Sequence, residues 1–139
     1  LVSLDARNYG ARAWVVKAVA ALRDPRGLDL LEHALDADIA PSVRRSAARG
    51  LADLELDPLC RDQQLHRCMQ GLLKAGQDDE WVVRYAAAFG IEQRLTDAAG
   101  GSSLAGQAMP LLRTLASDAE DAKVVRLRAA LALQRLNAG

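Results

Sequence analysis

The chain has 139 residues and a mass of 14.9 kDa, enough for one domain with its own core. Half of the residues are apolar, and eighteen basic residues balance eighteen acidic ones, so no net charge draws the protein to nucleic acid or to an anionic membrane. No stretch approaches the roughly 20 apolar residues of a membrane span, and no signal peptide is visible. We therefore expect a cytoplasmic protein.

Four stretches share one pattern, in which an arginine is followed by small or aliphatic residues at steps of three and four. The four arginines, 32, 40 and 42 residues apart, are Arg12, Arg44, Arg84 and Arg126. The sixth residue after each arginine is alanine or glycine. Such steps place the apolar residues on one face of a helix. The pattern predicts helices over 9–23, 41–55, 79–95 and 121–137, with the small residue allowing a neighbouring helix to approach closely.

A further apolar stretch precedes three of these helices and predicts a first helix for each pair, over 27–36, 62–75 and 104–117. A helix pair every 40 residues or so is the HEAT and armadillo period. We therefore expect an all-α protein, an α-α superhelix (solenoid) of about 3.5 HEAT-like repeats. Pro110 lies where the first helices of HEAT repeats often carry a kinking proline, and Thr96–Gly106 is expected to be the one long flexible connection.

Residues 1–139 are expected to form a single domain. The chain begins with Leu1 and almost directly enters a helix that corresponds to the second helix of a repeat, so we expect a fragment of a longer product. The first repeat lacks its own first helix, and solenoid ends need a cap. Upstream residues or another subunit are expected to cover the apolar end formed by Ala13, Trp14 and Val15.

An acidic residue lies six positions before three of the repeated arginines, as Asp38, Asp78 and Glu120. There it can cap the N-terminus of the second helix and pair with an arginine of the same or the next repeat. We interpret the last three repeated arginines as parts of this structural ladder and not as catalytic residues.

The familiar catalytic and phosphate-binding motifs are absent from the sequence. Cys60, His66 and Cys68 form a cluster with the wrong spacing for ordinary zinc modules, and we interpret them as loop or surface residues with reduced thiols. No metal is expected, and His33 is interpreted as an isolated, exposed helix residue.

The residues one and five positions after each repeated arginine point away from the predicted core, on the side that usually lines the concave face of a solenoid. These rows gather basic and aromatic residues, flanked by two tryptophans: Lys17, Arg45, Arg49, Tyr85 and Phe89, with Trp14 and Trp81. Rings and guanidinium groups suit a flat, unsaturated ligand that bears carboxylates. Alternatively, Tyr85 and Phe89 pack against a neighbouring helix and the arginines are solvated; the sequence leaves both interpretations open.

Four strings are more specific than the repeat pattern. They are NYGARAW at 8–14, DPRGL at 24–28, SVRRSAARGL at 42–51 and EWVVRYAA at 80–87. Together they resemble the E/F-type phycobilin lyases, HEAT-like proteins of cyanobacterial light-harvesting assembly, and in particular the F-type (β) subunits of phycocyanobilin lyases. The resemblance covers about residues 8–95, whereas the last repeat is similar to HEAT repeats in general.

The resemblance implies an enzyme that acts as a heterodimer with an E-type subunit. Such lyases attach a linear tetrapyrrole, here of the phycocyanobilin type, to a cysteine of a phycobiliprotein α-subunit by adding the thiol to the bilin's ethylidene group. The bilin is then a substrate, and no cofactor is expected. Related pairs isomerise or detach the bilin, but the Cys/His motif of the isomerising relatives does not match Cys60, His66 or Cys68, so attachment is expected.

The resemblance also implies roles for the basic and aromatic surface. Arg45, Arg49 and Lys17 would bind the two propionates, and the aromatic side chains Trp14, Trp81, Phe89 and Tyr85 would pack against pyrrole rings. A proton donor is also required, for which Tyr9, Tyr85 or a nearby acid would serve. Two other functions stay open: a non-catalytic adaptor or disassembly factor of the phycobilisome, and an unrelated HEAT scaffold that binds a peptide.

Overall fold

The computed structural model describes residues 8–98 and 102–138, and these form seven α-helices and two short 3-10 helices without a β-strand. The α-helices are α1 (Tyr9–Leu22), α2 (Leu28–Ala37), α3 (Pro41–Asp53), α4 (Arg61–Ala75), α5 (Trp81–Asp97), α6 (Ser102–Leu115) and α7 (Lys123–Ala138). The 3-10 helices η1 (Pro25–Gly27) and η2 (Pro58–Cys60) each start with a proline and lead into α2 and α4. Each predicted α-helix is present, with its ends shifted by a few residues.

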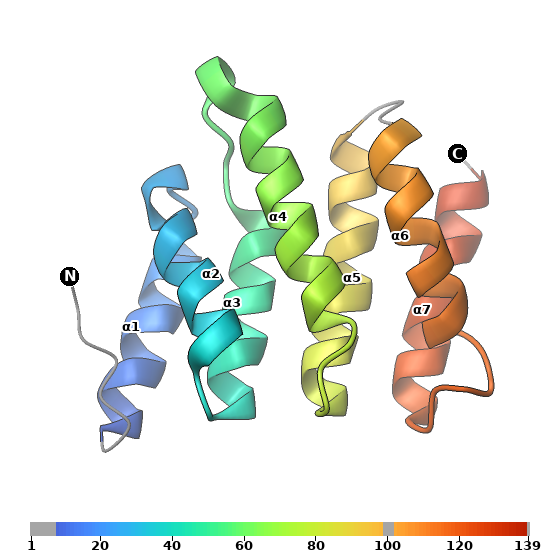
Figure 1. Cartoon of the computed structure of the whole chain (residues 1–139), viewed down its shortest axis with the longest axis horizontal. Helices are drawn as coiled ribbons and strands as arrows, with labels where there is room; N and C mark the ends of the chain where they lie inside the picture. Colours follow the sequence, from blue (N-terminus) through green and yellow to red (C-terminus); the bar gives the residue numbers. More distant parts are fainter. Residues whose placement is uncertain (1–7, 99–101, 139) are drawn as a thin grey trace.

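The helices stack in two layers (Figure 1). The first-helix layer consists of α2, α4 and α6, and the second-helix layer of α1, α3, α5 and α7. Within the second-helix layer α1 packs on α3, α3 on α5 and α5 on α7. This repetitive stacking is that of a HEAT-like solenoid and confirms the predicted fold class.

The core lies between the two layers and contains mainly leucine and alanine. Its largest members are fully buried and include Leu31, Leu51, Leu72, Ile91 and Leu112. Glycine at the sixth position after the arginine lets neighbouring second helices approach closely. A Cβ on Gly50 would lie 2.9 Å from the Cβ of Ala20, and one on Gly90 would lie 3.0 Å from the Cβ of Ala52. The predicted role of the small residue is confirmed at these two positions.

The buried side chain of Arg94 binds the backbone at the C-terminal end of α3. Its Nε donates to the carbonyl oxygen of Leu51 at 2.9 Å and its Nη2 to that of Leu54 at 2.7 Å. The last carbonyl groups of a helix have no partner within the helix, and the side chain of Arg94 satisfies two of them from α5. Arg94 lies outside the repeated pattern, so the periodicity gave no signal for it.

The predicted long connection between α5 and α6 is largely helical. Of the segment Thr96–Gly106, the residues up to Asp97 belong to α5 and those from Ser102 onward to α6, while 99–101 lie outside the described residues. Glycine and serine are poor helix formers, but packing overrides that preference here because Leu104 and Ala108 are buried in the core. Pro110 lies inside α6, which continues as a helix through it.

The repeated arginines form a ladder along the turns between first and second helices. The first three guanidinium groups bind the carboxylate of the following repeat through Nε and Nη2 at 2.7–3.1 Å, in the pairs Arg12–Asp38, Arg44–Asp78 and Arg84–Glu120. The same carboxylates accept the backbone N–H two residues further on, at 2.9–3.0 Å. One acid therefore caps a helix and joins two repeats.

The ladder also holds each turn from within its own repeat. The Nη1 of Arg44, Arg84 and Arg126 donates to the backbone carbonyl six residues earlier, at 2.9, 2.9 and 2.6 Å. The predicted ladder is thus confirmed: the carbonyl comes from the arginine's own repeat and the carboxylate from the next one.

Candidate functional site

The exposed side of the second-helix layer carries an aromatic stripe along α5. Trp81, Tyr85 and Phe89 are four residues apart, a spacing that places side chains along one face of a helix. Trp81 is 47% exposed, and the other two are partly exposed. The rings of Trp81 and Tyr85, which line a groove, are therefore within reach of a ligand on this surface.

A groove of about 320 Å³ opens over the first part of this stripe. Its lining comes from three successive second helices and consists of Arg45 of α3, Trp81, Val82 and Tyr85 of α5, and Val124 of α7. We call it the α3–α5–α7 groove. Two rings, two aliphatic side chains and one guanidinium group surround the same space, which is the usual mixture of a site for a flat, partly apolar ligand.

One turn further along α5, Phe89 contacts arginines from both neighbouring helices. The guanidinium carbon of Arg49 lies 4.1 Å from the ring centroid, and that of Arg128 lies 5.6 Å away. Arg128 also pairs with Glu92 at 2.7 Å, where both side chains are nearly buried. Phe89 is therefore engaged by this chain's own arginines and serves to hold them in place.

Three cations on this side of the molecule lack an acidic partner. Among the described residues, no carboxylate lies within ion-pair distance of Lys17, Arg45 or Arg49. By contrast, Arg44 and Arg84 are each paired within the ladder. The unpaired cations can bind the carboxylates of a ligand without breaking an existing ion pair.

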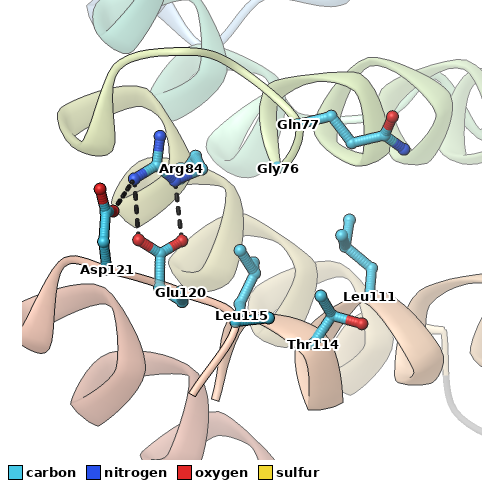
Figure 2. A pocket seen from close by; sticks show the side chains of 9 residues that line it. Gly76, Gln77, Arg84, Leu111, Thr114, Leu115, Glu120 and Asp121 are labelled. Atoms are coloured by element: carbon cyan, nitrogen blue, oxygen red, sulfur yellow. Dashed lines mark hydrogen bonds and ion pairs between the residues drawn. The ribbon is translucent and has the colours of Figure 1, made fainter. Parts of the chain in front are cut away.

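A larger hollow, of about 410 Å³, lies between the α4–α5 turn and the α6–α7 turn. Figure 2 shows Arg84 facing Glu120 and Asp121 at its side, with Leu111 and Leu115 nearby. Arg84 is already bound to both carboxylates, at 2.7 and 3.1 Å. Its hydrogen bonds to Glu120 raise the pKa of Arg84 and lower the pKa of Glu120. The charges of this hollow belong to the ladder, so the α3–α5–α7 groove is the better candidate site.

The other predicted ligand-contacting and catalytic residues lie outside the groove lining. The phenol oxygen of Tyr9 is 2.6 Å from Oγ of Ser42, and Lys17 is exposed on α1. Trp14 is 72% exposed, two positions after its repeated arginine. Arg128 occupies that position in α7 and faces the preceding helix α5, so Trp14 faces away from α3.

The cysteines occupy different environments. Cys68 is fully buried in the core, so its interpretation as a loop or surface residue is wrong, whereas Cys60 is partly exposed and His66 exposed. Burial raises the pKa of the Cys68 thiol, although the Arg94 guanidinium at 3.8 Å acts in the opposite direction. No cluster of three or more His, Cys, Asp or Glu side chains suited to a metal ion occurs in the described ranges.

Sequence reasoning missed three residues of this surface: Val82, Val124 and Arg128. A signal was present, because both valines stand two positions before a repeated arginine, in register with each other across α5 and α7. Applying the repeat register to that position as well would have found them.

Within the described part of the chain, no helix has both the length and the apolar character needed to cross a membrane.

Comparisons with known proteins agree on one family, although no family model matches the chain. The chain is 60% identical over 136 residues to the bilin biosynthesis protein RpcF of Synechococcus sp. WH8020, covering 98% of this chain and 64% of that protein. It is 42% identical over 139 residues to the phycocyanobilin lyase subunit beta of Nostoc sp. PCC 7120, covering 95% and 65%. A phycobilisome maturation protein of Synechococcus elongatus is 41% identical over 145 residues, covering 100% and 67%.

A solved structure shows the same fold. It is that of the complex of CpcE and CpcF of phycocyanin lyase from Nostoc sp. PCC7120, matched with a TM-score of 0.78 and 39% identity over 91% of this chain and 73% of that chain. The chain spans slightly less than two thirds of the length of the first two relatives. Sequence and structure together show that this chain belongs to the E/F-type phycobilin lyases, among their F-type (β) subunits.

Proposed function

We propose that this chain is the F-type subunit of a heterodimeric bilin lyase, which attaches a linear tetrapyrrole of the phycocyanobilin type to a cysteine of a phycobiliprotein α-subunit. The observation that carries the proposal is the α3–α5–α7 groove, where two rings stand beside the unpaired Arg45. The names of the relatives, phycocyanobilin lyase subunit beta among them, support the choice of ligand and reaction.

The groove and the surface beside it match the chemistry of a bilin. A bilin offers flat conjugated rings and two propionates, and Trp81 and Tyr85 provide faces on which such rings can stack. Arg45 and Arg49 lie one helical turn apart on α3, about 6 Å along the helix, and each can bind a carboxylate in a bidentate manner. Lys17 adds a third unpaired cation on α1.

In the chemical step, this chain has to position the bilin and the acceptor thiol and to supply a proton. The S–H of the acceptor cysteine adds across the exocyclic C=C of the bilin: a C–S bond forms at one carbon, and the neighbouring carbon gains a proton. Tyr85 lines the groove and is the better-placed donor, while Tyr9, hydrogen-bonded to Ser42, is the second candidate. Holding thiol and bilin together supplies the rest of the rate enhancement.

The proposal includes two protein partners, an E-type subunit and the acceptor α-subunit. No nucleic acid, membrane, metal or separate cofactor takes part, and the bilin is the substrate. The location is the cytoplasm, which agrees with two cysteines that remain free thiols.

The test combines the full-length protein with the E-type subunit, phycocyanobilin and the apo-α-subunit. Covalent bilin is then measured by absorbance and fluorescence of the denatured α-subunit. Bilin should become attached only when both subunits are present. Tight binding of the α-subunit without any covalent bilin would contradict the lyase and favour a non-catalytic scaffold. If neither the α-subunit nor the bilin binds, both the lyase and the scaffold are contradicted.

A further inference from the structure

Arg128 of α7 approaches the ring of Phe89 and is neutralised by Glu92 of α5. Its Nη2 lies 2.7 Å from Oε1 of Glu92, and the two side chains are only 11% and 12% exposed. Its guanidinium carbon lies 5.6 Å from the centroid of the Phe89 ring. Its Nη1 is buried and makes no hydrogen bond within the described residues. The carboxylate of Glu92 and the face of the ring therefore offset the burial of this charge.

The pair of Glu92 and Arg128 is not part of the repeat. The two residues stand eight and two positions after the repeated arginines of their helices. At the α3–α5 contact the same positions hold Ala52 and Ala86, which are fully buried, and at the α1–α3 contact they hold an alanine and a serine. Neighbouring second helices thus pack without an ion pair here. Because a nearly buried ion pair is a weak source of stability, the pair indicates a role other than packing.

The two arginines beside Phe89 differ in the charge that they offer to a ligand. The charge of Arg128 is neutralised by Glu92. Arg49 of α3 lies 4.1 Å from the same ring centroid and has no carboxylate within ion-pair distance among the described residues. Arg49 is also partly exposed, so a ligand carboxylate can reach it. The contact from α7 therefore holds the ring, and the contact from α3 carries the available charge.

We propose that Glu92 and Arg128 are positioning residues of the bilin site. Held by Glu92, Arg128 keeps the ring of Phe89 in the orientation over which Arg49 stacks. Arg49 then meets one propionate of the bilin in a fixed orientation, so less side-chain freedom is lost on binding. The inference rests on the proposed function in taking the carboxylate to be that of the bilin.

The experiment measures kcat, and KM for phycocyanobilin, with the full-length protein, the E-type subunit and the apo-α-subunit. Phe89→Leu removes the ring, and Glu92→Ala with Arg128→Ala introduces the residues of the α3–α5 contact; neither variant changes the net charge. Each should raise KM about fivefold, the cost of ordering one arginine side chain on binding, and leave kcat within about twofold. Phe89→Tyr restores a ring face for Arg49 and should restore KM.

The Arg49→Ala background separates a positioning role from a merely structural one. If the changes act through Arg49, they should raise KM no further once Arg49 is alanine, because the effects of coupled residues are not additive. Arg135→Ala is the control. Arg135 is 58% exposed and lies 3.5 Å from Oε2 of Glu92, and its removal leaves the pair with Arg128 in place, so KM should not change.

The outcomes separate this inference from the proposed function. Unchanged KM in either variant, or the same rise in the Arg49→Ala background, overturns the positioning role and leaves the lyase proposal intact. If the double alanine variant does not fold, Glu92→Gln with Arg128→Ser takes its place, again without a change in net charge. Failure of the unmodified protein and both partners to attach bilin overturns the proposed function, and this inference with it.

Discussion

Arg49 of α3 lies over the ring of Phe89 of α5, with its guanidinium carbon 4.1 Å from the ring centroid. The contact crosses between two repeats and orients a cation that no carboxylate neutralises among the described residues. Arg45 stands one turn earlier on the same helix and lines the groove. Stacking thus positions positive charge for a ligand while leaving that charge available.

Replacing Arg45 and Arg49 together by alanine should lower bilin transfer at least tenfold and hardly change stability. A cation–π contact at an exposed site contributes about 0.5–1 kcal/mol, and neither arginine forms an ion pair with another described residue. Initial rates of covalent attachment and urea unfolding measure the two effects. Lysine at both positions should restore little activity, because it cannot bind a carboxylate in a bidentate manner.

Arg113→Ala is the matched control for this pair. Arg113 is an exposed arginine on α6, in the other layer, and its removal should change neither rate nor stability. A folded double variant with full activity would show that the groove is not where the carboxylates bind.

Arg84→Ala should destabilise the protein by about 1–3 kcal/mol, the cost of leaving buried polar groups without their partners. The side chains of Arg84 and Glu120 are only 14% and 4% exposed, and the variant also loses two bonds to carbonyl groups of the α4–α5 turn. The control is Arg26→Ala, which removes an exposed pair with Asp24 and should have no measurable effect. Equal thermal midpoints for the two variants would contradict a structural role of the ladder.

The ladder should also make stability fall in acid. Hydrogen bonds from Arg84 lower the pKa of Glu120. Burial by itself would raise the pKa of Asp78, but hydrogen bonds from Arg44 and from the backbone N–H of Glu80 outweigh it, so this pKa is also lowered. Carboxyl groups titrate near about 4 in the unfolded chain. Because the folded state binds these protons more weakly, the stabilisation is complete above that pH and is lost as pH falls through the lowered folded pKa values.

Urea unfolding between neutral pH and about pH 3 measures this dependence. Glu120→Gln should be less stable at neutral pH and should lose less stability on acidification, since one of the paired carboxylates is gone. An identical acid dependence in the variant would mean that Glu120 does not take part.

Gly50→Ala should destabilise the protein although alanine favours helices. The new Cβ would lie 2.9 Å from the Cβ of Ala20 and from a methyl group of Leu31, and such overpacking costs about 1–3 kcal/mol. Gly106 is also helical, but a Cβ there meets nothing within 4 Å, so Gly106→Ala should stabilise by up to about 1 kcal/mol. Stabilisation by both substitutions, measured in urea, would contradict close packing of α1 on α3.

Much of the fold could be predicted because the information is local. Apolar residues at steps of three and four define which face of each helix is buried, whatever lies opposite. The recurrence of this pattern after an arginine predicted the four second helices, and the apolar stretches before three of them predicted the first helices. The acid six positions before three of the arginines predicted the ladder. The same register identified Arg45 and Tyr85, and both line one groove together with Trp81, which was expected to flank them.

Only the tertiary structure decided which groups meet across repeats. In the structure, the carboxylate of Asp78 binds Arg44 of the preceding repeat. Arg49 and Arg128 lie over the ring of Phe89, and Cys68 is buried. Helical periodicity gives the direction of a side chain around its own axis, but not the rotation and offset between stacked helices. Those two quantities determine whether a residue such as Trp14 faces a neighbouring helix or lies on an uncovered surface.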